Sequence, residues 1–496
     1  MIRRLLLAAV ALLVLLVVVL GVNTLTTGSR QLQVPAVAGP KVDEQAVGES
    51  LAQAIRARTI SSATDAAQNV DQFEALQAHL RRRYPRVHAQ LKREVIGGLS
   101  LLYTWVGTDA SAPAIALMAH QDVVPIAPGT EGDWLAEPFA GTIKDGYVWG
   151  RGAWDDKSNL ITQLEAVESL LGEDFVPRRT VYLVFGADEE VGGERGALQI
   201  SRLLQQRGVK LEYVIDEGLL LTQGILKGLK APAALVGVAE KGYVSVRMQS
   251  KAPPGHSSLP PAVPGQQAIA QISRALVALD NRPMPATIGG VAGDMFDVLA
   301  PEMDGLQRVV LSNRWLFGPL LVRQLEQAGS TNALLRTTTA LTIVNAGNKD
   351  NVLPGRAEAV VNFRLAPGDS RQTVVDHVRR TIANDAIEVA PLPGGSEPSA
   401  VADTAAPSYQ AINRTVREVF PGALVAPGLM LAGTDSRHFE PFTRQIYRFS
   451  PVRAGPDDLS RFHGTNERIS LANLAEMVRF YHRLLQHTAG APGASR

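Results

Sequence analysis

The chain has 496 residues and contains no cysteine. Hydrophobic residues make up 46% and charged residues 20%, which excludes a disordered or collagen-like chain and fits a globular protein of two or three domains. Without cysteine there can be no disulfide, thiolate zinc site, iron–sulfur cluster or cysteine nucleophile, so any metal must be held by His, Asp and Glu. The net charge of +1 offers no basic excess for nucleic acid, and no nucleic-acid partner is expected.

The first segment predicts a membrane anchor. Residues 5–22 form an uncharged apolar run after Arg3 and Arg4. At about 1.5 Å per residue this run nearly crosses a hydrocarbon core of about 30 Å. The two arginines favour the cytoplasmic side, so the rest of the chain would be periplasmic or at the cell surface. A cleaved signal peptide, which would give a secreted protein, is the alternative, although its apolar core usually has about 7–15 residues.

Three apolar runs predict strands buried on both faces of a sheet. They cover residues 114–119, 180–185 and 211–215, and helices fit between them at 157–171 and 196–206. This alternation predicts an α/β protein with a largely parallel sheet. Ligands bind beyond the carboxyl ends of such strands. The polar side chains at those ends, which are typical of metal or acid–base chemistry, are His120, Asp122, Glu189, Glu190 and Asp216.

A glycine-rich loop at 150–157 lies between the first two strands. Either Asp155 or Asp156 could be the N-cap of the following helix while the other points into the site. His256 and His463 also lie in loops that contain glycine. Taken alone, each of these two histidines would more often be structural than catalytic.

Six separated motifs, taken in order, resemble the dizinc aminoacylase/carboxypeptidase family, which includes the acetylornithine and succinyl-diaminopimelate deacylases. The resemblance covers roughly residues 45–487. Segments 312–317, 336–342 and 361–364 are similar to the branch that holds vacuolar carboxypeptidase S and the secreted N-fatty-acyl-amino-acid synthase/hydrolase. The six motifs are His120-x-Asp122, the loop at 150–157, Glu189-Glu190, Asp216, Gly255-His256-Ser257 and His463.

The resemblance implies two metal sites that share one carboxylate. Asp155 would bridge two zinc ions, for which cobalt or manganese could substitute. His120 and Asp216 would complete one metal site. Glu190 and His463 would complete the other.

The resemblance also implies amide hydrolysis of a small peptide or an N-acyl amino acid, including long-chain N-acyl substrates, in a reaction that could run in reverse. A hydroxide between the metals would attack the amide carbonyl, with Glu189 as general acid/base. Asp122 would orient His120, and His256 would stabilise the oxyanion, commonly from the other subunit of a dimer. The residues that would bind the substrate and its free carboxylate are Arg364, Asn351, Gly433 and Thr434.

The spacing of the motifs implies a catalytic domain that is interrupted by a lid. The candidate ligands lie between residues 120 and 216, except for one at residue 463, so the chain must leave the site and return. By resemblance the inserted lid is an α+β, ferredoxin-like domain that could form a homodimer. The expected organisation is an anchor at 1–22, a linker at 23–42, catalytic parts at 43–240 and 396–487, a lid at 241–395 and a flexible tail at 488–496.

Residues 283–335 look like an insertion relative to the shortest family members. Their apolar side chains, including Trp315 and Phe317, could line a pocket for a long acyl chain, and extra lid core or a dimer contact explains them equally well. Two other functions stay open. One is a catalytically inactive binding domain of the same fold, and the other is a metal-dependent phosphoesterase, because dinuclear sites serve both chemistries.

Overall fold

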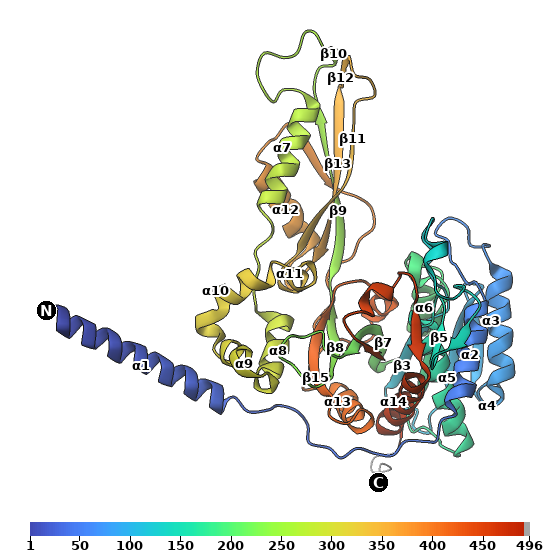
Figure 1. The fold of residues 1–496 in the computed structure, drawn as a ribbon. Coiled ribbons are helices and arrows are strands. Elements are labelled where there is room, and N and C mark those ends of the chain that lie inside the picture. Colours follow the sequence, from blue (N-terminus) through green and yellow to red (C-terminus); the bar gives the residue numbers. More distant parts are fainter. Residues whose placement is uncertain (491–496) are drawn as a thin grey trace.

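The computed structural model describes residues 1–490, which form a catalytic domain, a lid and a separate N-terminal helix (Figure 1). The catalytic domain is built on an eight-stranded mixed sheet. Strands β6, β3, β7 and β16 are parallel neighbours, β8 pairs in parallel with β15, and β1 and β2 add an antiparallel edge. In sheet order the strands are β1 (Lys92–Ile96), β2 (Ser100–Trp105), β6 (Val181–Gly186), β3 (Ala114–His120), β7 (Leu211–Thr222), β16 (Ile446–Ala454), β8 (Ala233–Glu240) and β15 (Leu424–Met430).

Helices cover both faces of this sheet, which explains the continuous apolar runs in its central strands. Along β3, Ile115 and Leu117 pack toward one core cluster and Ala116 and Met118 toward another, because side chains alternate along a strand. The first cluster contains residues of several helices, and α6 (Ala197–Gln206) contributes to the second. Four of the helices of the first cluster are α2 (Glu44–Arg56), α5 (Lys157–Gly172), α13 (Pro407–Val419) and α14 (Leu471–Ala489).

Short elements connect the loops that carry the candidate ligands. Strand β5 pairs with both β4 and β17 in a small antiparallel sheet. This pairing places the loop that follows β5 beside the loop that precedes β17. The remaining elements of the catalytic domain are α3 (Val70–Arg83), α4 (Pro85–Gln90), β4 (Thr142–Lys144), β5 (Tyr147–Trp149) and β17 (Arg468–Ser470).

The lid contains a four-stranded antiparallel sheet with two helices, which fits the α+β lid that the resemblance implied. Helices α7 and α12 pack against this sheet around a core of their own. Strands β10 and β12 pair antiparallel at the far end of the lid from β3 and β7 (Figure 1). In sheet order the strands are β11 (Thr338–Ala346), β13 (Arg356–Leu365), β9 (Gly242–Lys251) and β14 (Ile387–Pro391), and the other elements are α7 (Ala268–Asn281), α12 (Arg371–Ile382), β10 (Gly255–His256) and β12 (Val352–Leu353).

Residues 290–335 form four helices that pack on the catalytic domain and not on the lid sheet. Met295, Leu299 and Leu321 share an apolar cluster with Leu424 and Ala426 of β15. The segment expected to be all lid is therefore divided between two places. The helices are α8 (Gly290–Leu299), α9 (Gly305–Ser312), α10 (Arg314–Leu325) and α11 (Gly329–Leu335).

The N-terminal helix α1 (Ile2–Thr26) projects from the body near α9 and α10 (Figure 1). It is long and apolar enough to cross a membrane, and none of its residues is fully buried. The segment after α1 runs along the catalytic domain, where Gln31 is buried and exchanges hydrogen bonds with the backbone of Val425. At the other end α14 continues to Ala489, and the predicted flexible tail lies outside the described residues from 491 onward.

Candidate metal centre

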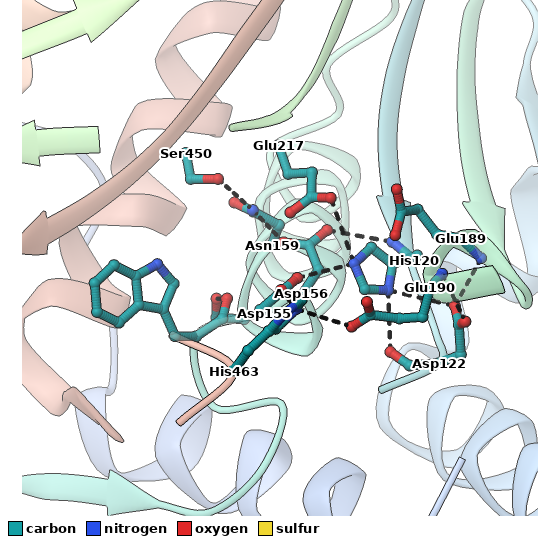
Figure 2. A network of polar contacts seen from close by, with 12 residues as sticks. His120, Asp122, Asp155, Asp156, Asn159, Glu189, Glu190, Glu217, Ser450 and His463 are labelled. Carbon is teal, nitrogen blue, oxygen red and sulfur yellow. Dashed lines mark hydrogen bonds and ion pairs between the residues drawn. The ribbon is translucent and has the colours of Figure 1, made fainter. Parts of the chain in front are cut away.

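Asp155, in the loop before α5, lies at the centre of the site between two histidines (Figure 2). Its Oδ1 is 2.9 Å from Nε2 of His120, and its Oδ2 is 2.8 Å from Nε2 of His463. Burial alone would raise the pKa of Asp155, but hydrogen bonds from both histidines lower it. A carboxylate with one oxygen directed at each of two imidazoles is well placed to bridge two metal ions.

His120 is the last residue of β3, and Asp122 lies behind its ring. Nδ1 of His120 is 3.0 Å from the carbonyl oxygen of Asp122 and 3.4 Å from Oδ1 of the same residue. The Asp122 carboxylate also accepts hydrogen bonds from the backbone N–H groups of Glu189 and Glu190, at 3.2 and 3.1 Å. Asp122 thus holds the imidazole and the Glu189–Glu190 turn together, which is the position that its predicted role requires.

Glu190 and His463 form the second half of the cluster. Oε1 of Glu190 is 3.4 Å from Nε2 of His463, and this oxygen is buried without a hydrogen-bond partner among the described residues. The hydrogen bond to Asp155 and the neighbouring carboxylate of Glu190 raise the pKa of His463 to about 10. A buried carboxylate oxygen that lacks a hydrogen bond, next to an imidazole nitrogen, is suited to a metal ion.

The structure differs from the sequence-based expectation in β7, where Glu217 and not Asp216 points at His120. Oε1 of Glu217 is 3.5 Å from Nε2 of His120. The carboxylate of Asp216 instead accepts the backbone N–H groups of Ser436, at 2.8 Å, and of Glu217, at 2.9 Å. Burial raises the pKa of both carboxyl groups and the charge of His120 lowers it, so both side chains lie near the imidazole. Glu217 is therefore a further candidate ligand, while the role of Asp216 as a ligand stays a prediction.

Asp156 also lies in the site. It stands at the N-cap position of α5, but its side chain does not cap the helix. Oδ2 accepts a hydrogen bond from the backbone N–H of His120 at 3.2 Å, and Oδ1 accepts one from the amide of Asn159. Both aspartates of the pair therefore point toward the cluster, where the sequence left open which one would cap the helix.

A buried ion pair between Arg151 and Glu467 joins the loop of Asp155 to the loop of His463. Nη1 of Arg151 donates to Oε2 of Glu467 at 2.7 Å, and Nη2 donates to the carbonyl oxygen of His463 at 3.1 Å. Oε1 of Glu467 accepts the backbone N–H groups of Trp154, at 2.7 Å, and of Asp155, at 3.1 Å. The sequence contained both residues, but nothing in their spacing indicated that they would pair.

Glu189 follows β6 and borders the open cleft beside the cluster. Burial raises the pKa of its carboxyl group well above the usual value, and the nearby carboxylates of Asp435 and Glu190 add to this effect against the charge of His120. Among residues 1–490, no hydrogen bond engages its carboxylate. The side chain is thus free to exchange a proton with a molecule in the cleft.

The donors in this cluster fit bound metal. Ligand atoms of His120, Asp155 and Glu190 all lie within 4.8 Å of one another, as do those of His120, Asp156 and Glu217. Burial raises the pKa of Glu190 and of Glu217, because several acidic groups are crowded together away from water. Bound cations would stabilise the charged carboxylates. Imidazole and carboxylate are ordinary ligands of zinc, and they also suit cobalt and manganese.

The cluster opens into a cleft with about 2020 Å³ of empty space, part of it open to solvent. Arg364 of β13 borders this cleft, with its guanidinium 5.1 Å from the ring centre of Tyr243. Gly433 borders it as well. Thr434 is fully buried and donates a hydrogen bond to Glu240 at 3.2 Å. Of the predicted substrate residues, Arg364 and Gly433 therefore lie where a substrate can reach them, and Thr434 lies behind them.

His256 and Asn351 lie together at the tip of the lid and apart from the metal cluster of the same chain (Figure 1). His256 is exposed, and the backbone N–H of Ser257 donates to the carbonyl oxygen of Asn351 at 3.0 Å. Their separation from the cluster is what the predicted supply of His256 by a second subunit requires.

The inserted helices do not border the cleft. None of the residues that line the cleft comes from 283–335, and the nearest link is Lys241, whose ammonium donates to the carbonyl oxygens of Ala333 and Arg336 at 2.8 and 2.7 Å. Trp315 is 60% exposed on the outer surface. The expectation that this segment lines an acyl pocket is therefore not supported by its position.

Comparison with known proteins agrees with the geometry of the site. The sequence profile of peptidase family M20/M25/M40 matches residues 116–487. The chain is 41% identical to the N-fatty-acyl-amino acid synthase/hydrolase PM20D1.1 of Danio rerio, over 88% of this chain and 84% of the relative. It is 37% identical to the probable carboxypeptidase S-like 2 of Dictyostelium discoideum, over 96% of this chain and 93% of the relative.

Solved structures share the fold. The M20 family metallo-carboxypeptidase Sso-CP2 from Sulfolobus solfataricus superposes with a TM-score of 0.64 at 18% identity, covering 90% of this chain and 99% of that one. Human carnosine dipeptidase 1 gives a TM-score of 0.56 at 15% identity, covering 92% and 100%. The profile match, the relatives and the fold agree, and the chain belongs to the peptidase family M20/M25/M40, as a metallohydrolase with a candidate metal site around His120 and Asp155.

Proposed function

We propose that this protein is a dizinc hydrolase that cleaves the amide bond to a C-terminal amino acid with a free carboxylate. Its substrates are N-acyl amino acids, including long-chain ones, or small peptides, and the reaction can run in reverse. The observation that carries the proposal is the position of Asp155, with one carboxylate oxygen on each of two histidines beside an open cleft. The names of the relatives, N-fatty-acyl-amino acid synthase/hydrolase and carboxypeptidase S-like, support this substrate class.

Five side chains would hold the metals. Zinc bound at this site would polarise the amide carbonyl and lower the pKa of a water molecule between the two ions. Asp155 would be shared by both metal positions. His120 and Glu217 would complete one position, and Glu190 and His463 the other.

Glu189 is the general acid/base in this proposal. It takes a proton from the attacking water and delivers it to the leaving amine nitrogen. Its backbone N–H donates to the carboxylate of Asp122, while its own carboxylate borders the cleft. The division of labour between Glu189 and Glu190 follows from geometry, because Glu190 points to His463 and Glu189 does not.

Arg364 supplies the positive charge that binds the substrate's carboxylate. Its guanidinium lies in the same cleft as Glu189, and a guanidinium can bind a carboxylate through two parallel hydrogen bonds. The ring of Tyr243 beneath it limits its orientations. Gly433 leaves room at the cleft wall for the substrate backbone, since a side chain there would meet Arg437 and Glu240.

The active form is a homodimer in which His256 and Asn351 act on the partner's site. Strand β11 is the edge of the lid sheet, and Leu341, Ile343 and Val344 on it are 43–58% exposed. An exposed apolar edge strand is a template for pairing with another strand. A second copy of the lid would cover this edge, and the tip of one lid would then reach the cleft of the other subunit.

The protein acts outside the cytoplasm, held by α1 in the membrane. The support is the length and hydropathy of α1 together with Arg3 and Arg4 at its start. If α1 is removed as a signal sequence, the same domain is secreted.

The test is hydrolysis and metal content of the full-length protein in detergent. The wild type is expected to bind two zinc ions and to hydrolyse N-acetyl- and N-oleoyl-phenylalanine. Glu189→Gln should retain zinc and lose activity by about 10²–10⁴-fold. Glu74→Gln, a matched change at an exposed position on α3, should change neither. Wild-type turnover by Glu189→Gln would refute the assigned base, and zinc binding without amide hydrolysis would favour a phosphoesterase or an inactive binding domain.

A further inference from the structure

We propose that the face formed by Leu306, Trp315, Leu316 and Leu320 on α9 and α10 docks into the outer leaflet of the membrane that α1 spans. The partner is a phospholipid bilayer. The inference rests on the extracytoplasmic anchor proposed above. It assigns a role to the inserted helices, which do not line the cleft.

The side of α1 that meets the inserted helices is identified by partial burial. Most residues of α1 are exposed, but Leu16, Leu20, Asn23, Thr24 and Thr27 are partly covered. Their spacing of three or four residues places them on one face of the helix. Helix α1 packs against α9, so this stripe faces the insert.

The depth of this contact places the insert within the apolar part of the bilayer. The uncharged run of α1 ends at Val22, and Leu16 lies six residues further in. At about 1.5 Å per residue this difference is about 9 Å along the helix. Interfacial helices bury their apolar faces by about 5–10 Å. If residues 5–22 span the hydrocarbon, the part of the insert that packs beside Leu16 lies at that depth.

Asn313, between α9 and α10, fixes the insert to α1. Its side chain is fully buried, and Nδ2 is 3.1 Å from Oγ1 of Thr24 and 3.3 Å from the carbonyl oxygen of Leu20. Its Oδ1 accepts hydrogen bonds from Asn23 at 3.2 Å and from the indole N–H of Trp315 at 3.3 Å. A buried amide with these partners sets one position of α10 relative to the anchor.

The surface beside this joint has the composition of a membrane-facing helix. Trp315, Leu320 and Leu306 are 60%, 61% and 72% exposed, and Leu316 and Pro319 lie on the same face of α10. Trp is enriched at the boundary between hydrocarbon and headgroups. Arg323 is exposed one turn after Leu320, where its charge can meet a lipid phosphate.

Docking would bring the enzyme to its substrates. A long-chain N-acyl amino acid is amphipathic and partitions into the leaflet with its carboxylate at the surface. An anchor alone would let the domain swing away from the bilayer. The joint at Asn313, together with the apolar face, would instead hold the catalytic domain against the surface where the substrate accumulates.

The absence of cysteine makes a direct test simple, because one introduced cysteine carries one label. We would place a spin label at Leu320→Cys and at Leu306→Cys in the full-length protein reconstituted in phosphatidylcholine vesicles. Collisions with oxygen, which concentrates in lipid, would be compared with collisions with a water-soluble nickel chelate. Leu13→Cys in α1 is the membrane control, and Val106→Cys, 69% exposed on the catalytic domain, is the aqueous control.

The labels at Leu320 and Leu306 are expected to collide more often with oxygen than with the nickel chelate. In this ratio they should resemble the label at Leu13 and differ from the label at Val106. An aqueous value at Leu320 with a lipid value at Leu13 would overturn the docked face and leave the anchor in place. Collision ratios typical of water at all four labelled positions would overturn both the docked face and the membrane anchor. Hydrolysis of N-acetyl-phenylalanine by the same labelled proteins reports on the proposed activity separately, because this short substrate does not need the bilayer.

Discussion

Asp216 and Glu217 are adjacent acidic residues near His120, and Oε1 of Glu217 lies 3.5 Å from Nε2 of that histidine. The pairing of β7 with β16 shifts register between Asp216 and Leu219, so regular alternation along the strand does not decide which of the two holds a metal. Side chains along a regular strand point alternately to the two faces of the sheet, so an error of one position moves a predicted ligand to the other face. The sequence located the acidic pair and predicted Asp216 as the ligand, and the position of Glu217 beside His120 makes Glu217 a second candidate.

Metal content should separate these two residues. Glu217→Gln removes a charged ligand from the His120 site, so zinc bound after dialysis is expected to fall from two ions per chain toward one. Asp216→Asn keeps an oxygen that can accept the N–H of Ser436, so zinc affinity should fall by about 10–100-fold at most, as is usual for residues around the ligands. Zinc would be measured by mass spectrometry. The opposite order of zinc loss would restore Asp216 as the ligand.

At the scale of elements, much of the fold was predictable. The strands at 114–119, 180–185 and 211–215 exist because apolar runs between helices can be buried only in a sheet covered on both faces. The arrangement of the site was less accessible. The Arg151–Glu467 pair joins residues 316 positions apart, and such a contact depends on the pairing of β5 with β17, which no local pattern reveals.

The pair between Arg151 and Glu467 should be required for metal geometry. Glu467→Gln keeps the shape of the side chain. It puts an amide, however, where two carboxylate oxygens accept hydrogen bonds from Arg151 and from two backbone N–H groups. We expect kcat/KM to fall by about 10–100-fold, together with zinc affinity. The matched control is Glu476→Gln, which alters a partly exposed pair with Arg453. Equal effects of the two variants would show that the loss is one of general stability.

A second ion cluster joins α13 to α14 and should make stability depend on pH. Glu418 is 1% exposed and accepts hydrogen bonds from Arg414, Arg483 and His487. Burial alone would raise its pKa, but the hydrogen bonds from Arg483, Arg414 and His487 lower it to about 2. A carboxyl group with a lowered pKa stabilises the fold above its unfolded value of about 4.3, and this stabilisation is lost as the pH falls toward 2.

Glu418→Gln is expected to lower the free energy of unfolding by about 3 kcal/mol at pH 7, because it leaves two arginines near a neutral group. The difference from the wild type should shrink between pH 4.5 and pH 2.5, because there the carboxyl group takes up a proton in the unfolded chain while it stays largely ionised in the native one. Urea unfolding followed by tryptophan fluorescence at several pH values measures both. A difference that stays constant across this range would contradict the assignment.

At the scale of the whole molecule, the sequence predicted an anchor, a catalytic domain and a lid, but not the position of the inserted helices. Residues 283–335 are apolar whether they line a cleft, complete a core or face lipid, so composition alone could not distinguish these possibilities. Their place is set by long-range packing on β15 and on α1. The same limit applies to His256, whose loop was evident while its distance from the site was not.

The division of the site between two subunits gives the last prediction, which concerns the assembled molecule. Glu189→Ala and His256→Ala homodimers should each be nearly inactive, because each lacks one component of every site. In a mixed dimer, the subunit that keeps Glu189 can receive His256 from its partner, and one complete site is restored. Coexpression of the two variants with different affinity tags allows the mixed dimer to be isolated.

The mixed dimer should regain up to about half of the wild-type kcat, since one of its two sites is whole. As a control, a mixed dimer of Glu189→Ala with Glu190→Ala should stay inactive, because those residues serve the same subunit's site and cannot complement each other. If His256 acted within its own chain, the first pair would fail to recover as well, and the lid would have to fold over its own cleft. Recovery of activity therefore distinguishes a His256 supplied by the partner's lid from one supplied by closure of the subunit's own lid. In the structure, β10 lies at the lid tip and does not contact the metal cluster of its own chain.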